Sequence, residues 1–515
     1  MEKYNRSENT RQLVKSCVCD KRVTKEMSVD FTLPDYQPEI KRLLRIGTDV
    51  LLPESSFGMN DCEFSGIIDY YVTYLGSDNQ MYCAPLSTEY RINIPIEDNR
   101  GLSYDGDANI ICEFVNGRVT APRKISIRSR LLAHASIFNN IPLENEFSDG
   151  ADPSFAKRLD GQVMAAAIER GASGTVNISN EIIPDRREGD VRVVCAEGHA
   201  FINEYQAQSG TLNCKGEAYV KLLICPDEGE IPYTVTRKLP FGVSLPMENA
   251  DTGCTVSAKA SVRELTVTVD EGRIELSLGV SVNATVGVNK PVAYTKDMYS
   301  TLCNTTCDYF SPEVLVVKGG VNTNLSLGET RTLEELKLPH DVILVDTSAD
   351  VMTENVEIVD SRAKISGKVK YSLLLHRDGE YSVSEMEFPF IYSAEVKDGT
   401  DMAVADCGVI TSRGRIDGER MGLDSEIYVC MSFFSREKIN ALTALHFGEL
   451  VKRDSGKITV YYPSGSDSLW SVGKRYNVSP EKLVDDNKVS LKSHTEVRVD
   501  SRESLAGAHH LIITL

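Results

Sequence analysis

The sequence predicts a mainly β protein, with about three repeated antiparallel sandwich or open-barrel units and a small C-terminal strand–helix–helix–strand (βααβ) module. The chain has 515 residues, which is too long for one hydrophobic core. Three observations support this fold class. A glycine-led strand pattern recurs at a nearly constant spacing, apolar and polar residues alternate with a period of two, and residues 457–515 differ from the rest in pattern and charge.

The repeat is defined by three glycines, each followed by a run of strand-forming residues. Gly66 leads GIIDYYVTYL, Gly216 leads GEAYVKLLI and Gly367 leads GKVKYSLLL, at spacings of 150 and 151 residues. A near-constant period is typical of an internal repeat. Because glycine tolerates backbone angles and close approaches that other residues do not, we expect the three glycines to occupy one structural position, starting or kinking the same strand.

Periodicity assigns the remaining segments. Apolar and polar residues alternate through 256–282, on either side of a hairpin turn expected at Asp270-Glu271-Gly272. Residues 154–171 and 436–453 instead have helical periodicity. In chain order, the predicted segments are a polar tail (1–27), β unit 1 (28–140), a helical connector (141–174), β unit 2 (175–290), an ordered connector (291–319), β unit 3 (320–435), a helical linker (436–456) and the C-terminal module (457–515).

The C-terminal module reads as two strands around two short helices. KITVYY is the first strand and LIITL the second. Asp467 or Ser468 is placed to cap the first helix, whose Leu469, Val472 and Tyr476 share one face. Ser479 caps the second helix and Pro480 occupies its first position, which turns Leu483 and Val484 inward.

Charge and cysteine usage restrict the partners and the compartment. The formal net charge is −19, which disfavours nucleic acid and anionic membrane surfaces, whereas residues 457–515 carry a net charge of +1. The N-terminus lacks the apolar core of a secretory signal, and no apolar run is long enough for a transmembrane helix. Together with an odd, scattered set of 13 cysteines, this predicts a protein that remains in a reducing cytoplasm.

No motif for catalysis or cofactor binding is found. Phosphate-binding glycine loops, paired zinc-binding histidines and the serine nucleophile elbow do not occur. Cys17 with Cys19 and Cys303 with Cys307 have the wrong spacing for a zinc knuckle, so we interpret them as free thiols. The sequence therefore predicts a protein that is not an enzyme, with no catalytic residue, metal or cofactor.

Three stretches carry a resemblance to a known family. The segments DFTLPDYQPEIKRLLRIGTDV (30–50) and YTKDMYST (294–301), with the strand at Gly66, resemble the SPOCS domain, and residues 457–515 resemble LysM. Repeated SPOCS domains followed by LysM resemble the SipL-like family of spore-coat morphogenetic proteins of endospore-forming Firmicutes. The resemblance implies an adaptor in spore-coat assembly at the forespore surface in the mother-cell cytoplasm. It also implies as partner an ATPase of the stage IV sporulation protein A type, or other coat proteins.

The LysM resemblance implies where a partner would bind. In glycan-binding LysM domains two loops form a groove, but the second loop here, SLAGAHH (504–510), departs from that pattern, which favours a protein partner. Trp470 is interpreted as a core residue, since the family uses an aromatic there for packing. The alternative is binding of peptidoglycan or cortex glycan through the same surface. The predicted partner- or glycan-binding residues are Ser464, Gly465, Ser466, Asp467, Ser468, Leu469, Lys474, Arg475, Val478 and Asn487.

Overall fold

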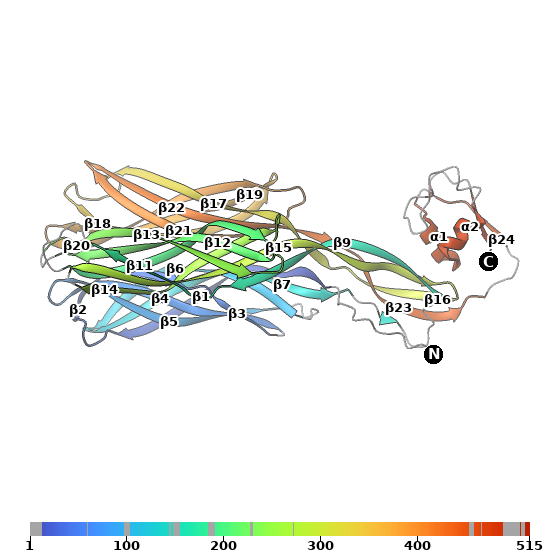
Figure 1. Ribbon diagram of the computed structural model, residues 1–515, viewed down its shortest axis with the longest axis horizontal. Coiled ribbons are helices and arrows are strands. Elements are labelled where there is room, and N and C mark those ends of the chain that lie inside the picture. The colour runs from blue at the N-terminus through green and yellow to red at the C-terminus, as the bar shows by residue number, and fades with distance from the viewer. Residues whose placement is uncertain are drawn as a thin grey trace.

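The protein, described here by a computed structural model, is mainly β, with several antiparallel sheets and, among the described residues, two short helices (Figure 1). Long strands gather in a body that tapers into a stalk, and both helices lie at the far end of that stalk. The structure describes residues 13–58, 60–96, 103–143, 146–147, 155–183, 191–226, 230–270, 272–452, 458–464, 466–487, 505 and 510–514.

The first core lies between two sheets in the N-terminal part of the chain. One sheet has the order β1-β7-β6, and in the other β4 pairs with β2, β3 and β5. Buried side chains of both sheets, such as Phe64, Tyr70 and Ile127, form one apolar cluster. The strands are β1 (Leu13–Thr32), β2 (Ile40–Val50), β3 (Glu54–Phe57), β4 (Asp61–Gly76), β5 (Met81–Pro95), β6 (Ser103–Ala121) and β7 (Lys124–Pro142).

The second core has the same arrangement of strands. β12 is the middle strand of the order β11-β12-β13, and β15 lies between β10 and β14 in the facing sheet. The turn between Asp270 and Arg273 closes the β14–β15 hairpin at the predicted place. The strands are β9 (Ala156–Ala172), β10 (Val176–Ile182), β11 (Arg192–Gln208), β12 (Thr211–Cys225), β13 (Tyr233–Pro246), β14 (Thr255–Asp270) and β15 (Arg273–Ser300).

The third core also lies between two sheets, which here are both three-stranded, with the orders β18-β19-β20 and β17-β22-β21. Its first strand pairs with its last, as β1 pairs with β7 and β10 with β15 in the other two cores. The strands are β17 (Glu313–Thr332), β18 (Ile343–Val359), β19 (Arg362–Arg377), β20 (Glu380–Glu395), β21 (Met402–Asp417) and β22 (Arg420–Lys438).

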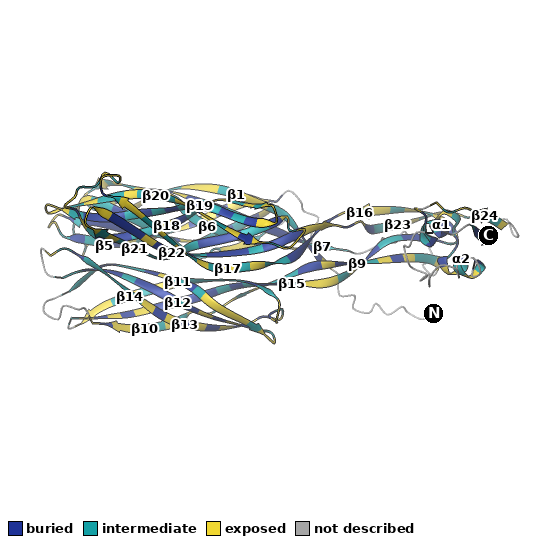
Figure 2. Ribbon diagram, turned by 90° about the horizontal axis from the view of Figure 1, so that it is seen from above, coloured by how far each residue is buried: buried dark blue, intermediate teal, exposed yellow. Residues whose placement is uncertain are grey.

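The stalk is formed by strands that continue beyond the second and third cores. The distal half of β15 pairs with β9, and β16 (Cys303–Phe310) pairs with β23 (Ala441–Leu450). A two-residue strand, β8 (Glu146–Phe147), lies parallel to β23. Figure 2 shows these strands leading away from the cores to the helices.

The prediction of two helices before the C-terminal module is wrong. Residues 156–172 form strand β9, and residues 436–450 form the end of β22 and strand β23. In β9, Leu159, Val163 and Ala165 point inward at even spacing because the long strand β15 supplies its backbone partners. Tertiary pairing here overrides a helical pattern.

The unit boundaries also differ from those expected. Residues 13–27 of the predicted polar tail belong to β1, and the predicted connector 291–319 consists of the end of β15, all of β16 and the start of β17. β17 begins at Glu313 rather than at residue 320, and β22 ends at Lys438. The strands pass these limits because partner strands continue beyond the cores.

The last described segment contains two strands and two helices in the order β24, α1, α2, β25. β24 (Ile458–Tyr461) pairs antiparallel with β25 (Leu511–Thr514), and α1 (Leu469–Tyr476) and α2 (Pro480–Asp486) lie between them in the chain. Neither described helix has the length or apolar content needed to cross a lipid bilayer.

Candidate functional site

The C-terminal module is held together by a small apolar core. The hydroxyl of Ser468 accepts a bond from the backbone N–H of Ser471, and Ser479 caps α2 in the same way, so both expected caps form. Leu469, Val472 and Leu483 are buried against Leu511 and Ile513 of β25. The predicted inward faces of both helices are therefore confirmed.

The module docks on the stalk through one aromatic contact and a set of polar contacts. The rings of Trp470 in α1 and Tyr299 in β15 meet edge to face, with centroids 4.9 Å apart. The Tyr299 hydroxyl is buried and donates to the carbonyl oxygen of Val478 at 2.8 Å. The expectation that Trp470 belongs to the module's core is wrong, because the ring is only half-buried and packs against Tyr299 of the stalk.

Asp297 of β15 is the polar centre of this contact. Its carboxylate accepts bonds from Trp470 Nε1 at 2.8 Å, from Lys474 Nζ at 2.6 Å and from the Tyr309 hydroxyl at 2.8 Å. Burial alone would raise the pKa of Asp297, but the bonds from Lys474 and Trp470 outweigh it and lower that pKa. The contact therefore joins an ionised carboxylate to the module.

Two further interactions define the docked orientation. The side-chain amide of Asn477, the left-handed residue that ends α1, donates to the carbonyl oxygens of Ser300 and Cys303 at 2.9 and 3.2 Å. Lys157 of β9 forms an ion pair with Glu481 of α2 at 3.2 Å. Both helices are thus tied to the stalk.

The predicted binding residues of the first loop are partly exposed. Ser464 and Ser466 are exposed, whereas Asp467 and Leu469 are buried, and Gly465 lies outside the described residues. The Asp467 carboxylate accepts bonds from the Ser464 backbone N–H at 2.8 Å and from the Tyr461 hydroxyl at 2.7 Å. Asp467 therefore organises the loop instead of facing a partner.

The remaining predicted residues divide between surface and interior. Arg475 is exposed, whereas Lys474 is only partly exposed and its ammonium is engaged by Asp297, so the prediction that Lys474 contacts a partner is not supported. Val478 is buried beside Tyr299. Asn487 is also buried, and its amide bonds to the backbone of Leu483 and Ile512, which links α2 to β25. Of the second predicted loop, 504–510, only Leu505 and His510 are described.

The outer side of β24 is an apolar surface of the module. Ile458, Val460 and Tyr462 lie at alternate positions and are all exposed, Tyr462 to 74%. Tyr462 lies next to the exposed hydroxyls of Ser464 and Ser466 in the chain. We call this strand face, together with the exposed Ser464, Ser466 and Arg475, the distal surface.

A second polar site joins the three cores. Arg45 of β2 bonds to Asp346 of β18 at 2.7 Å and approaches Glu197 of β11 at 3.7 Å. Lys221 of β12 contacts both carboxylates, at 2.9 Å for Glu197 and 3.3 Å for Asp346. Burial would raise the pKa of both acids, but the attraction of Lys221 and Arg45 prevails and lowers it. We call these four residues the central charge cluster.

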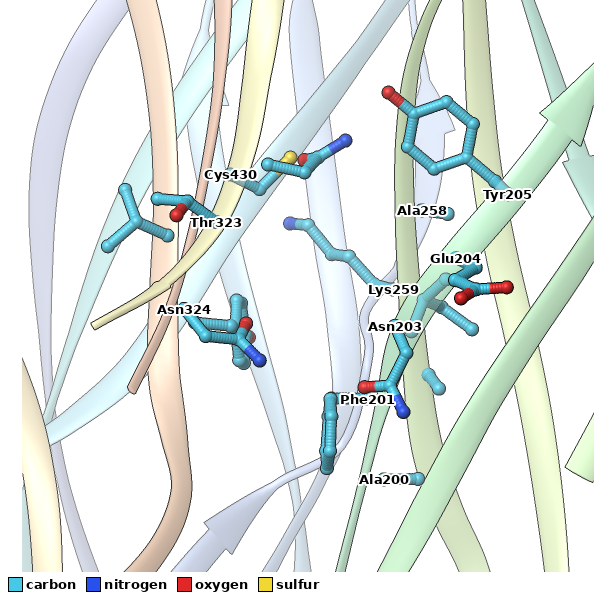
Figure 3. A pocket seen from close by; sticks show the side chains of 15 residues that line it. Ala200, Phe201, Asn203, Glu204, Tyr205, Ala258, Lys259, Thr323, Asn324 and Cys430 are labelled. Carbon is cyan, nitrogen blue, oxygen red and sulfur yellow. The ribbon is translucent and has the colours of Figure 1, made fainter. Parts of the chain in front are cut away.

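A cavity of about 370 Å³ opens between the second and third cores. Figure 3 shows Lys259 reaching into it, with Asn203 and Tyr205 of β11 on one side and Thr323 and Asn324 of β17 on the other. The ammonium lies 3.2 Å from Asp406 of β21. Burial disfavours that charge, but Asp406 and Asp107 more than compensate and raise the pKa of Lys259. The cation is therefore already satisfied by the protein.

The docking contact was missed by the site prediction, although the sequence carried a signal for it. Asp297 and Tyr299 lie in YTKDMYST, the segment that resembled the SPOCS family, but it was interpreted as a connector. Within the part of the chain that the structure describes, no group of three or more His, Cys, Asp or Glu side chains could hold a metal ion. No protein-family model matches the chain, and comparisons with curated proteins and with solved structures give no match either.

Proposed function

We propose that this chain is a non-catalytic adaptor. Three copies of one β unit form its body, and a LysM-like module at the end of the stalk binds a protein partner. Each copy comprises two facing sheets with the strand order described above. Gly66, Gly216 and Gly367 lie on β4, β12 and β19, opposite Tyr90, Phe241 and Phe390 of the next strand. This equivalence supports a repeat of one unit.

The observation that carries the proposal is the anchoring of the module to the stalk. Trp470, Lys474 and Asn477 all bond to β15 or its end, which orients the module relative to the body. An adaptor needs such a connection, because a binding module on a flexible linker would not fix the orientation of its bound partner relative to the body. The distal surface then remains for the partner.

The partner follows from the resemblance to SipL-like spore-coat proteins. It is an ATPase of the stage IV sporulation protein A type, bound at the forespore surface in the mother-cell cytoplasm. The distal surface has the composition of a protein-binding patch, because it combines the exposed apolar side chains of Ile458, Val460 and Tyr462 with the cationic Arg475. Aromatic and arginine side chains commonly dominate the binding energy of such interfaces.

One observation favours a second candidate, binding of peptidoglycan or cortex glycan. Tyr462 is exposed close in the chain to the hydroxyls of Ser464 and Ser466. An aromatic ring beside hydroxyl groups can stack on a sugar ring and bond to its substituents. The two candidates use the same surface, so one set of variants tests both.

The test measures binding of the full-length chain to the purified ATPase and, separately, to N-acetylglucosamine oligomers. We expect the ATPase to bind, deletion of 457–515 to abolish binding, and Arg475→Glu to slow association several-fold by removing a steering charge. Arg362→Glu on β19, another exposed arginine, is the matched control and should leave the rate unchanged. Retained ATPase binding after the deletion contradicts the adaptor role of the module, and oligomer binding by the intact chain favours the glycan candidate.

A further inference from the structure

Two thiols from different cores meet where the first and second cores pack together. Cys83 lies on β5 of the first core and Cys195 on β11 of the second, and their Sγ atoms are 2.9 Å apart. All thirteen cysteines of the chain carry free thiols. Other thiols are placed differently, since those of Cys17 and Cys112 donate to backbone carbonyls at 3.6 and 3.3 Å.

The separation of the two sulfurs is suited to bond formation. A disulfide has an S–S length of about 2.05 Å, so closing the gap takes less than about 1 Å of movement. The packing around the pair restricts other movements. Cys195 is buried in an apolar cluster with Val194, Leu223 and Val345, and Cys83 packs against that cluster.

The pair is also accessible to a small reagent. A cavity of about 370 Å³ is lined by both cysteines, together with Tyr71, Ser87 and Arg263. Cys83 is partly exposed, whereas Cys195 is buried. A peroxide entering this cavity therefore meets Cys83 first.

We propose that Cys83 and Cys195 are a redox-responsive clip, which a hydroperoxide converts into a disulfide that joins the first core to the second. The Cys83 thiolate attacks hydrogen peroxide, the O–O bond breaks, and a sulfenic acid and hydroxide result. Cys195 then attacks the sulfenic sulfur, the S–O bond breaks, and a second hydroxide leaves. The two thiol protons convert both hydroxides to water. Two thiols and one peroxide thus yield one disulfide and two waters, with two electrons passed to the peroxide.

The environment of Cys195 determines how the second step depends on pH. Its hydrogen bond with Cys83 and its burial raise the pKa of Cys195 well above the ordinary value of a thiol. Because the thiolate is the reacting form, cross-linking accelerates as the pH rises. The cross-link closes a loop of about a hundred residues, which restricts the unfolded chain and stabilises the contact between the cores.

The experiment treats the purified full-length chain with one equivalent of hydrogen peroxide, then maps cysteines by mass spectrometry without reduction. We expect a peptide pair joining Cys83 to Cys195 with the loss of two hydrogen atoms, reversal by dithiothreitol, and a higher urea midpoint after oxidation. Cys195→Ser and Cys83→Ala should each abolish the linked pair and the midpoint shift. Cys112→Ser, a half-exposed cysteine of the first core, is the control and should oxidise as the unaltered chain does.

Three results would overturn the inference. The first is accumulation of sulfinic acid on Cys83 while Cys195 remains a thiol. The second is a cross-link between other cysteines that forms at the same rate in both clip variants. The third is a linked Cys83–Cys195 pair with an unchanged urea midpoint, since the disulfide then does not stabilise the contact between the two cores.

Discussion

The three repeat glycines are each covered by an aromatic ring. On the neighbouring strand, the carbonyl oxygen of Phe201 lies where a Cβ at Gly216 would collide with it, and the carbonyl oxygen of Met352 does the same at Gly367. The strand is bulged there, between Ile202 and Glu204 and between Thr353 and Asn355. These glycines lie within a middle strand and not at its start, and glycine lets a bulged carbonyl approach.

Alanine at these positions tests this close approach. We expect Gly216→Ala and Gly367→Ala to destabilise the protein by about 1–3 kcal/mol, because the new methyl group meets a backbone atom that moves only with its sheet. Gly66→Ala should cost less, since its nearest atoms belong to the Tyr90 side chain. Urea unfolding measures the three effects. Gly174→Ala, where the space is open, is the control; equal losses at all four glycines would refute the explanation.

The elements of the C-terminal module depend on a few buried side chains. Leu469 is only 1% exposed and packs on Val472 and Leu483. We expect Leu469→Ala to cost about 2–5 kcal/mol, enough to unfold so small a module. Trp470, the only tryptophan in the sequence, reports the loss as a change in fluorescence during urea unfolding. Arg475→Ala on the same helix is the exposed control, and an unchanged Trp470 transition in Leu469→Ala would contradict the assigned core.

The contact between module and stalk should depend on pH. The pKa of Asp297 is lower in the folded protein than its ordinary value of 3.8. The stabilisation is therefore present above that ordinary value and is lost as the pH falls through the lower, folded pKa. We expect acid to detach the module below about pH 4, seen as a change in Trp470 fluorescence.

A neutral side chain at position 297 isolates this effect. Asp297→Asn should weaken docking by about 1–3 kcal/mol at neutral pH and flatten the acid response, because Lys474 loses its charged partner. Asp398→Asn, an exposed carboxylate in a turn, is the control. An acid transition of the same size in Asp297→Asn would show that another group controls docking.

At the scale of the whole molecule, the central charge cluster connects the three cores. Arg45, Glu197 and Asp346 come from three different cores and are buried or nearly so. We expect Arg45→Ala to destabilise the body by about 3–5 kcal/mol, because it leaves the buried Asp346 carboxylate without its closest cation. Arg45→Met combined with Asp346→Leu should recover part of that loss, since the Lys221–Glu197 pair at 2.9 Å remains. A urea double-mutant cycle measures the coupling, and strictly additive losses would contradict it.

The sequence by itself determined what local pattern controls. Alternation predicted the β14–β15 hairpin, the spacing of three glycines singled out positions that lie on β4, β12 and β19, and Ser468 and Ser479 marked the two helix starts. These signals either lie within a few residues of the structure they specify or repeat along the chain. Both kinds can be interpreted without knowing which distant residues will be in contact.

Tertiary structure alone decided the rest. Residues 156–172 became a strand because β15, more than a hundred residues later, supplies the hydrogen bonds that a helix would make internally. Val478 and Lys474 are not part of the exposed surface predicted for them, because Val478 accepts a hydrogen bond from Tyr299 of the stalk and Lys474 donates one to Asp297. Arg45 and Asp346, and likewise Cys83 and Cys195, become neighbours only once separate cores pack together. Such contacts join positions that no local periodicity connects, so their burial and charge follow from the packed fold.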